Sequence, residues 1–152
     1  KVWVYYMGGN GQHTNFRESS LGRAYWEVDK FACWTGRKEG IESILTTTTL
    51  TLSGDYVEVL ADVVDTEKDW ELAASVHPIW TENAYEGLRI EDAVAEKSGR
   101  WIRISWKGEK LPDKSGCIRF KFQNLKIWAV RGEMEYKGHR LWEGADMENE
   151  GM

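Results

Sequence analysis

Strict alternation of apolar and polar side chains in two segments constrains this fold more than any other feature of the sequence. Residues 101–106 place Ile102, Ile104 and Trp106 on one side of an extended chain and more polar residues on the other. The same period of two recurs in residues 118–122. A strand with this pattern buries one face only, so the sequence predicts antiparallel sheets that share one core.

Further segments rich in β-branched and aromatic residues are separated by Gly, Asp, Asn or Pro. They cover residues 2–7, 22–28, 44–52, 56–63, 70–76 and 125–130. Ile90–Lys97 has helix-forming composition but no apolar stripe, so it predicts one short turn at most. Strands of this kind in a chain of 152 residues predict one all-β domain, a two-layer antiparallel β-sandwich of the jelly-roll or concanavalin-like type.

The apolar phase changes between two neighbouring strands near the end of the domain. Up to Phe122 the apolar positions are even-numbered, whereas Leu125 and Ile127 are odd-numbered. One residue near Gln123 and Asn124 must absorb this change, so we expect a bulge or tight bend there.

Charge and aromatic content narrow the classes of partner. Twenty Lys and Arg against 25 Asp and Glu leave a net charge of −5, which argues against nucleic acid or an anionic membrane as partner. No apolar run approaches the roughly 18 residues of a membrane-spanning helix. Nine Trp, six Tyr and four Phe exceed what a core of this size needs, so we expect some rings to be exposed for binding.

The cysteines and the two ends of the sequence give weaker indications. Cys33 and Cys117 are far apart in the sequence, so they form no local redox or metal motif. We expect two buried free thiols, and the sequence neither requires nor excludes a disulfide between them. The start at Lys1, without a leader, is typical of an excised or mature segment. The acidic stretch Glu143–Met152 has no apolar pattern and is expected to be a solvated tail.

Several stretches, in a fixed order, carry a resemblance to a known family. They are Asp29–Phe31 before Thr46–Leu50, then Tyr85–Asp92 leading to Trp106–Gly108, then Cys117–Trp128. In this order they resemble the β-sandwich that follows the five-bladed propeller in glycoside hydrolase family thirty-two and in related sialidase-like proteins. A levan-binding carbohydrate module is also similar to that sandwich. The opening segment Trp3–His13 is similar to the final propeller strand of those proteins. The sequence departs from the family pattern at a few positions: Lys30 stands for Gly, Ala93 for Cys, Leu125 for Ala and Trp128 for Tyr.

The resemblance implies an organisation and a role. Residues 1–19 would be a last propeller-like strand and loop, 20–132 the sandwich, and 133–152 an extension with the acidic tail. The family's catalytic carboxylates come from earlier propeller blades, so the resemblance implies a non-catalytic module. Such a module would be extracellular or periplasmic, and it would bind an oligo- or polysaccharide or pack on a propeller catalytic domain. One alternative is a structural β-sandwich that self-associates, or packs on a missing domain, through exposed aromatic residues such as Trp3 and Tyr5. Another alternative is a small stand-alone glycosidase or lyase.

Sugar binding requires flat apolar faces together with planar hydrogen-bonding groups. The candidate aromatic residues are Trp80, Tyr85 and Trp101, of which Trp101 lies on the polar side of its strand, whereas Trp106 is expected in the core. The candidate polar residues are Glu91, Asp92 and Arg103. The alternative for the aromatic residues is burial in the core, and the alternative for the charged residues is a surface ion pair. A further alternative is that Glu86 forms a pair of hydrolytic carboxylates with Glu91 or Asp92.

One acidic loop is a candidate metal site. Asp62, Asp65, Glu67 and Asp69 supply hard oxygen ligands at a density that could hold calcium. Their spacing lacks the Gly and the terminal Glu of an EF-hand loop, which favours a solvated acidic turn instead. The histidines, His13, His77 and His139, have no spacing typical of a zinc site. No other cofactor is indicated.

Overall fold

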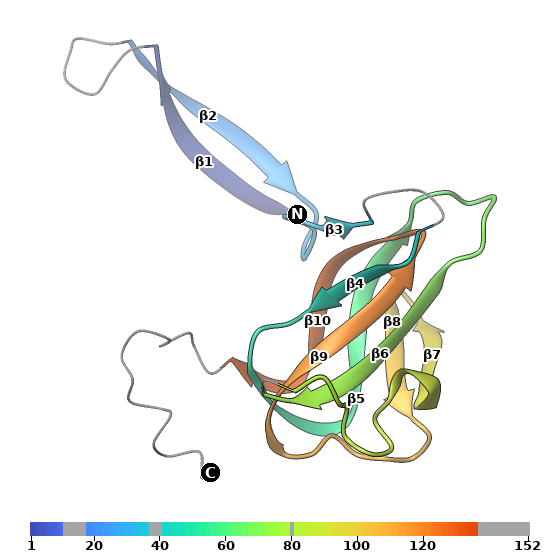
Figure 1. Ribbon diagram of the computed structural model, residues 1–152. Coiled ribbons are helices and arrows are strands. Elements are labelled where there is room, and N and C mark those ends of the chain that lie inside the picture. Colours follow the sequence, from blue (N-terminus) through green and yellow to red (C-terminus); the bar gives the residue numbers. More distant parts are fainter. Residues whose placement is uncertain (11–17, 37–40, 80, 137–152) are drawn as a thin grey trace.

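The computed structural model describes residues 1–10, 18–36, 41–79 and 81–136, and they form an all-β fold (Figure 1). The one helical element among these residues is a single 3₁₀ turn, η1 (Ile90–Asp92), so none of the described segments is a helix long and apolar enough to cross a membrane. Every strand pair is antiparallel. The predicted all-β antiparallel sandwich is confirmed.

The sandwich has two layers that share one continuous strand network. The first layer holds β4 (Ser43–Thr46), β9 (Lys114–Gln123) and β6 (Glu71–Pro78), with β9 in the middle. The second layer runs in the order β3 (Trp34–Thr35), β10 (Leu125–Tyr136), β5 (Leu50–Val63), β8 (Trp101–Trp106) and β7 (Ala93–Ser98). The layers join at one corner, where Leu50–Leu52 of β5 pairs with Lys114–Gly116 of β9.

The core lies between the layers and is built from the faces that the alternation predicts. Its innermost side chains, almost without solvent exposure, include Leu52, Val57, Val59, Val76, Ile104, Trp106, Ile118, Phe120, Leu125 and Ile127. Trp106 on β8 crosses to the other layer and donates a hydrogen bond from Nε1 to the Ala74 carbonyl oxygen of β6 at 2.9 Å. The predicted core position of Trp106 is confirmed.

The predicted change of phase is a tight bend between the layers. Asn124 adopts a left-handed backbone with φ of 57°, and the chain passes there from β9 in the first layer to β10 in the second. Its side chain holds the neighbouring loop: Nδ2 donates to the carbonyl oxygens of Asp65, Lys68 and Asp69, and Oδ1 accepts from the Asp65 amide. The expected bend at this position is confirmed.

Three expected elements differ from the structure. Residues 44–52 are divided between β4 and β5, because the chain changes layer at Thr47, whose hydroxyl and amide bond the Ile118 backbone in place of a continuing ladder. The strand expected at 56–63 is not separate, since β5 is one strand from Leu50 to Val63. Ile90–Lys97 is a single turn followed by strand β7, which pairs with β8 along its whole length. The small residues Ala93 and Ala95 face the core there, and they carry too little apolar signal to predict a strand.

The N-terminal hairpin stands apart from the sandwich. β1 (Val2–Gly9) pairs along its whole length with β2 (Ser19–Trp26), and this two-stranded sheet projects from the end of the sandwich where β3 begins (Figure 1). The boundary implied at residues 19 and 20 therefore falls inside one hairpin, and the boundary implied at residues 132 and 133 falls inside β10. Cys33 and Cys117 are free thiols, each half-buried.

Candidate functional site

The predicted sugar-binding residues do not form one site. Glu91 and Asp92 lie in η1, where Lys107 bonds the Glu91 carbonyl oxygen and pairs with the Asp92 carboxylate at 3.3 Å. Trp101 lies at the far end of β8, because the residue after Asp92 pairs with Trp106, which is about 17 Å of strand away from Trp101. Tyr85 is half-buried against the core, and Trp80 lies outside the described residues.

Trp101 is on the predicted outer face but is not exposed. Only 7% of the residue is accessible, because the Arg131 guanidinium of β10 lies over the Trp101 ring at 4.0 Å. Arg131 and Arg103 both bond the carboxylate of the buried Glu58, and Arg103 in turn covers Tyr56 at 4.0 Å. The expectation that Trp101 serves as an open platform is therefore wrong, and Arg103 is part of this closed cluster.

Opposing effects act on the Glu58 carboxylate. Burial raises the pKa of Glu58, but the hydrogen bonds and positive charges of Arg131 and Arg103 outweigh it and hold the pKa below its ordinary value. Glu58 is thus ionised and fully engaged. In this cluster the Trp101 ring is covered, whereas the Tyr56 ring stays 38% exposed.

The acidic loop does not assemble a metal site. Asp62 bonds Lys30 at 2.7 Å and accepts from Trp128 Nε1 at 2.8 Å, while Asp65 pairs with Lys68 and accepts from the Glu67 amide. No group of three or more His, Cys, Asp or Glu side chains converges as metal ligands in the described part of the chain. The structure therefore does not bring the side chains of Asp62, Asp65, Glu67 and Asp69 together, and the oxygens of Asp62 and Asp65 accept from protein donors.

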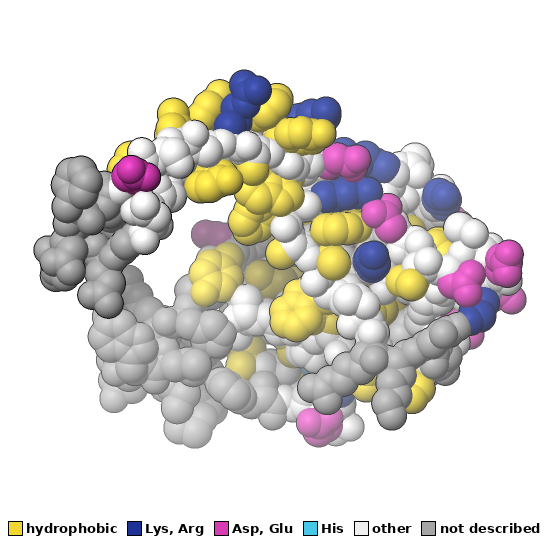
Figure 2. Space-filling view, turned by 90° about the horizontal axis from the view of Figure 1, so that it is seen from above, with side chains coloured by type: hydrophobic (Ala, Val, Ile, Leu, Met, Phe, Trp, Pro, Cys, Tyr) yellow, Lys and Arg dark blue, Asp and Glu magenta, His cyan; other side chains and the backbone are white. Residues whose placement is uncertain are grey.

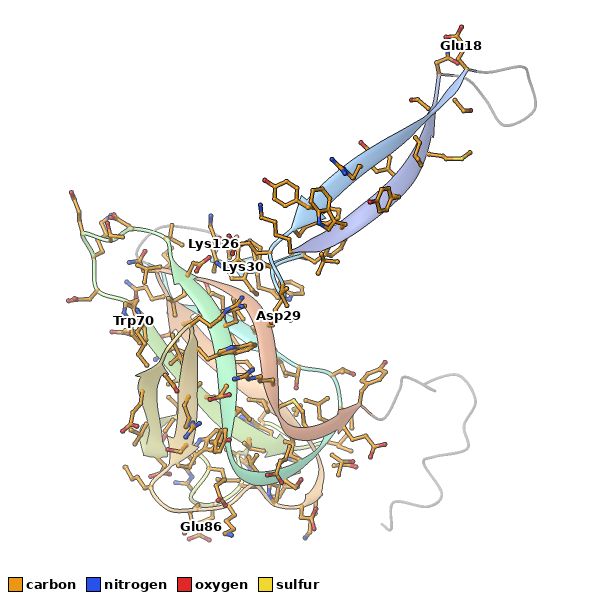
Figure 3. All side chains as sticks on the ribbon, turned by 180° about the vertical axis from the view of Figure 1, so that it is seen from behind. Glu18, Asp29, Lys30, Trp70, Glu86 and Lys126 are labelled. Atoms are coloured by element: carbon orange, nitrogen blue, oxygen red, sulfur yellow. The ribbon has the colours of Figure 1, made fainter. Side chains whose placement is uncertain are left out.

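Lys30 and Trp128 anchor the segment that leads from the hairpin into the sandwich. Both meet on Asp62 of β5, and Figure 3 shows Lys30 where the hairpin joins the sandwich. The hydrogen bond and charge of Asp62 raise the pKa of Lys30 despite some opposition from burial, and the Lys30 hydrogen bond lowers the pKa of Asp62. Arg100 adds a hydrogen bond to the Val28 carbonyl oxygen at 2.9 Å. The base of the hairpin is therefore fixed by polar contacts.

A buried polar cluster lies on the outer side of the first layer. His77 of β6 is 4% exposed, and its Nε2 is 2.7 Å from the hydroxyl oxygen of Ser75. Cys117 pairs with His77 across the sheet. Burial raises the pKa of the Cys117 thiol, and burial together with Cys117 raises the pKa of Tyr85. With these raised pKa values the thiol and the phenol are neutral near pH 7. His77 and Ser75 are the fully buried members of the cluster.

Acid should destabilise the protein through His77. Burial and the Arg119 charge lower the pKa of His77 below its ordinary 6.5, against a smaller opposing effect of Glu82. The unfolded chain then binds a proton that the folded chain does not, so the stabilising contribution is complete above pH 6.5 and is lost as the pH falls below it. We expect the free energy of unfolding to fall by at most about 1.4 kcal/mol per pH unit from this residue. Urea unfolding between about pH 8 and about pH 5 measures the slope.

The control for this prediction is H77Q, which should flatten the slope even if it lowers the stability at neutral pH. Glu58 and Asp62, whose pKa values are lowered, lose their contributions only below the ordinary values of 4.5 and 3.8. An unchanged slope in H77Q contradicts the assignment.

The hairpin exposes large apolar side chains on both of its faces. One face carries Trp3, Tyr5 and Met7 of β1 beside Leu21 and Tyr25 of β2. The other carries Val2 and Tyr6, and the Tyr6 ring lies over Gly22, where a Cβ would meet it at 2.4 Å. Figure 2 shows hydrophobic side chains on both sides of this arm. The signal in the sequence is the run Val2–Met7, which is apolar or aromatic without alternation.

Basic groups cover part of the first of these faces. The Lys1 ammonium is 4.2 Å from the centre of the Tyr25 ring, and the Arg23 guanidinium is 4.6 Å from the centre of the Trp3 ring. Even with these contacts Tyr5 is 62% exposed and Met7 is 74% exposed. The face is therefore apolar with one cation in its middle, since Arg23 lies opposite Tyr5 and between Leu21 and Tyr25.

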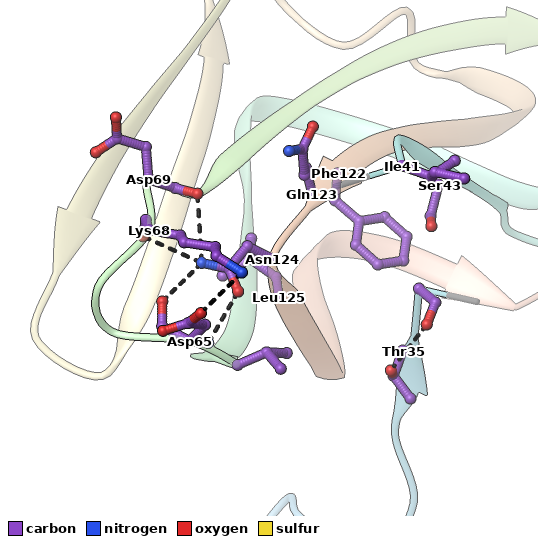
Figure 4. A pocket seen from close by; sticks show the side chains of 12 residues that line it. Thr35, Ile41, Ser43, Asp65, Lys68, Asp69, Phe122, Gln123, Asn124 and Leu125 are labelled. Carbon is purple, nitrogen blue, oxygen red and sulfur yellow. Dashed lines mark hydrogen bonds and ion pairs between the residues drawn. The ribbon is translucent and has the colours of Figure 1, made fainter. Parts of the chain in front are cut away.

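The end of the sandwich nearest the hairpin is open between its layers. A cavity of about 560 Å³, called the end cavity below, lies there between the 64–69 loop, the β9–β10 bend and the segments of β3 and β4 that face them (Figure 4). Its lining residues are Thr35, Gly36, Ile41, Ser43, Val64, Asp65, Lys68, Asp69, Phe122, Gln123, Asn124 and Leu125. The sequence places the bend at Gln123 and Asn124 correctly, but nothing in it shows that β3 and β4 close the opposite wall.

Comparison of the chain with protein-family models, curated proteins and solved structures returned no match.

Proposed function

We propose that this chain is a non-catalytic accessory β-sandwich that attaches to a partner domain of a glycoside hydrolase-like protein through the hairpin β1–β2. The observation that carries the proposal is the exposure of large apolar side chains on both faces of that hairpin. A fold does not by itself determine an activity, so the proposal depends on this exposed apolar surface.

The apolar faces of this hairpin require a partner surface to bury them. An isolated two-stranded sheet is only marginally stable in water, and contiguous exposed apolar surface favours association. An antiparallel sheet that faces water on one side shows polar residues there, whereas here Trp3 and Tyr5 on one face are matched by Val2 and Tyr6 on the other. A partner that buries the exposed apolar side chains of the hairpin must therefore contact both of its faces. Neighbouring strands or layers of a larger β structure would do so.

Charge and sequence support the same kind of partner. Lys1 lies at one end of the first face and Arg23 in its middle, each over an aromatic ring. A partner surface is complementary to this face when it combines carboxylates with aromatic side chains. The opening segment resembles the last propeller strand of sugar-cleaving enzymes, and such a propeller would supply both the cover and the catalytic carboxylates. The sandwich would then serve as a rigid body beside the active site.

The isolated chain offers a direct test. Without its partner, the hairpin should drive reversible self-association, so sedimentation velocity should show a mass that rises with protein concentration. The double variant W3S/Y5S should remain monomeric, because it removes the two rings from the face that carries most of the exposed apolar surface.

The matched control is I44S/V94S, which changes two exposed apolar side chains on the sandwich itself. It should associate like the unmodified chain. A chain that stays monomeric at millimolar concentration, or association that W3S/Y5S leaves intact, contradicts the proposal.

A further inference from the structure

The end cavity has an apolar lining that extends out to solvent. Phe122 and Leu125 are the buried members of this lining, whereas Ile41 and Val64 are each 54% exposed and form what we call its mouth. The volume of about 560 Å³ is typical of pockets that hold a drug-sized molecule, so there is room for one or two apolar side chains from outside. Exposed apolar surface around a hollow of this size favours association with another protein surface.

The rim of the end cavity is acidic. The loop on one side of it carries three carboxylates, Asp65, Glu67 and Asp69, and one ammonium, Lys68. Lys68 pairs with Asp65, so the exposed carboxylates of Glu67 and Asp69 leave the loop with a net negative charge. Figure 4 shows the Asp69 carboxylate pointing away from the Phe122 ring. A protein surface that closes this mouth is therefore complementary when it is apolar and carries a cation beside its apolar side chains.

The hairpin carries a surface of this kind. Met7 and Leu21 are cross-strand partners, and at 74% and 72% exposure they are the most exposed large apolar side chains in the described part of the hairpin. Arg23 is the next residue of β2 on the same face. Methionine is unbranched and adapts to irregular hollows. Two protruding apolar side chains with a neighbouring guanidinium thus match the apolar mouth and the acidic rim.

The position of the end cavity indicates which molecule supplies that surface. The hairpin leaves the sandwich at the end that holds the cavity and projects away from it (Figure 1). Met7 and Leu21 lie about 17 Å of strand beyond Trp26 at the base of the hairpin. When a second copy faces the first end to end, each pair of side chains reaches the end of the other sandwich. A two-fold axis makes both contacts equivalent, so the assembly closes at two copies.

We propose that two copies of this chain form a closed dimer in which Met7 and Leu21 of each hairpin enter the end cavity of the other copy. In this dimer Arg23 lies beside Glu67 and Asp69 at the rim. The inference rests on the proposed function, because it takes the hairpin as the attachment element. It adds the surface that receives the hairpin when the chain is alone, and it predicts an association that stops at the dimer.

Reversal of charge on each side of the contact tests the proposal. In sedimentation velocity the mass of the unmodified chain should level off at twice that of one chain. R23E should weaken the dimer about tenfold or more, because its carboxylate would face Glu67 and Asp69, and E67K/D69K should do the same by repelling Arg23. An equimolar mixture of R23E and E67K/D69K should restore the dimer, since both of its contacts then join opposite charges.

R89E is the matched control for charge. Arg89 is exposed but belongs neither to the hairpin nor to the cavity lining, so R89E should dimerise like the unmodified chain and should not restore a dimer with E67K/D69K. I41S/V64S tests the apolar mouth and should stay monomeric at concentrations where the unmodified chain and I44S/V94S are dimers. Circular dichroism confirms that each variant is folded.

The outcomes separate this inference from the proposed function. If W3S/Y5S abolishes association but I41S/V64S and the charge variants do not, the hairpin attaches elsewhere, and only the end-cavity dimer is overturned. A mixture of R23E and E67K/D69K that stays monomeric, or a mass that grows beyond two chains, also overturns the dimer alone. A chain that is monomeric at every concentration overturns both proposals.

Discussion

The W106A variant should lose about 3–5 kcal/mol of unfolding free energy, the largest effect that we expect from a single side chain. Trp106 is fully buried between the layers and is among the largest side chains of the core, so its removal leaves a cavity that the surrounding strands cannot fill. It also leaves the Ala74 carbonyl oxygen without its hydrogen bond from Nε1. Domains of this size are stable by only about 5–15 kcal/mol, so W106A should be partly unfolded at moderate temperature.

Urea unfolding followed by circular dichroism measures this effect. W106F separates its two causes, because phenylalanine refills most of the volume and leaves the carbonyl unpaired, at a cost of about 1–3 kcal/mol. W3A is the matched control: it removes the same side chain from the exposed hairpin and should change the unfolding of the sandwich by less than about 0.5 kcal/mol. Equal effects of W106A and W3A contradict the assignment of the core.

Alanine at position 116 should destabilise the protein by about 2–3 kcal/mol although it adds a single methyl group. Gly116 lies at the corner where β9 pairs with both β5 and β6, and a Cβ there would lie 2.6 Å from the His77 carbonyl oxygen. Because that oxygen belongs to the backbone of a paired strand, relief requires β6 to move away from β9 rather than a side chain to rotate.

G8A is the control for this prediction. Gly8 is also a strand glycine, but no atom lies within 4 Å of a Cβ placed there, so the substitution should be nearly neutral. Thermal unfolding of the three proteins compares them directly. A G116A variant as stable as G8A would show that the two layers do not meet at this corner as described.

The fold was largely predictable because its strands obey a period of two. Ile102, Ile104 and Phe120 face the core as their alternation requires, and the change of phase before Leu125 marks the bend at Asn124. The failures occur where the local signal is weak or misleading. β7 presents only alanines to the core, and the run of threonines after Leu45 predicts a strand, whereas the chain changes layer there.

The candidate site was much less predictable, because its properties depend on neighbours that are distant in the sequence. Trp101 does lie on the outer face, but its exposure is decided by Arg131, which comes from β10, two strands away across the sheet. Asp62 looked like a metal ligand until the fold placed Lys30 and Trp128 beside it. No pattern within the 62–69 segment carries that information.

Lys30 and Trp128 show the same dependence on distant neighbours. In the structure they bond the same carboxylate at the base of the hairpin. Together they fix the segment that joins the hairpin to the sandwich.

Hydrogen exchange of the hairpin amides tests the docking account most directly. In the dilute chain, the amides of residues 2–9 and 19–26 should exchange far faster than those of β5, β6 and β9, because a lone hairpin opens readily while the sandwich does not. In concentrated solution the same amides should become protected as the apolar faces are covered. Hairpin amides that are as protected as the sandwich strands at every concentration would show that the hairpin needs no partner, and would contradict the account.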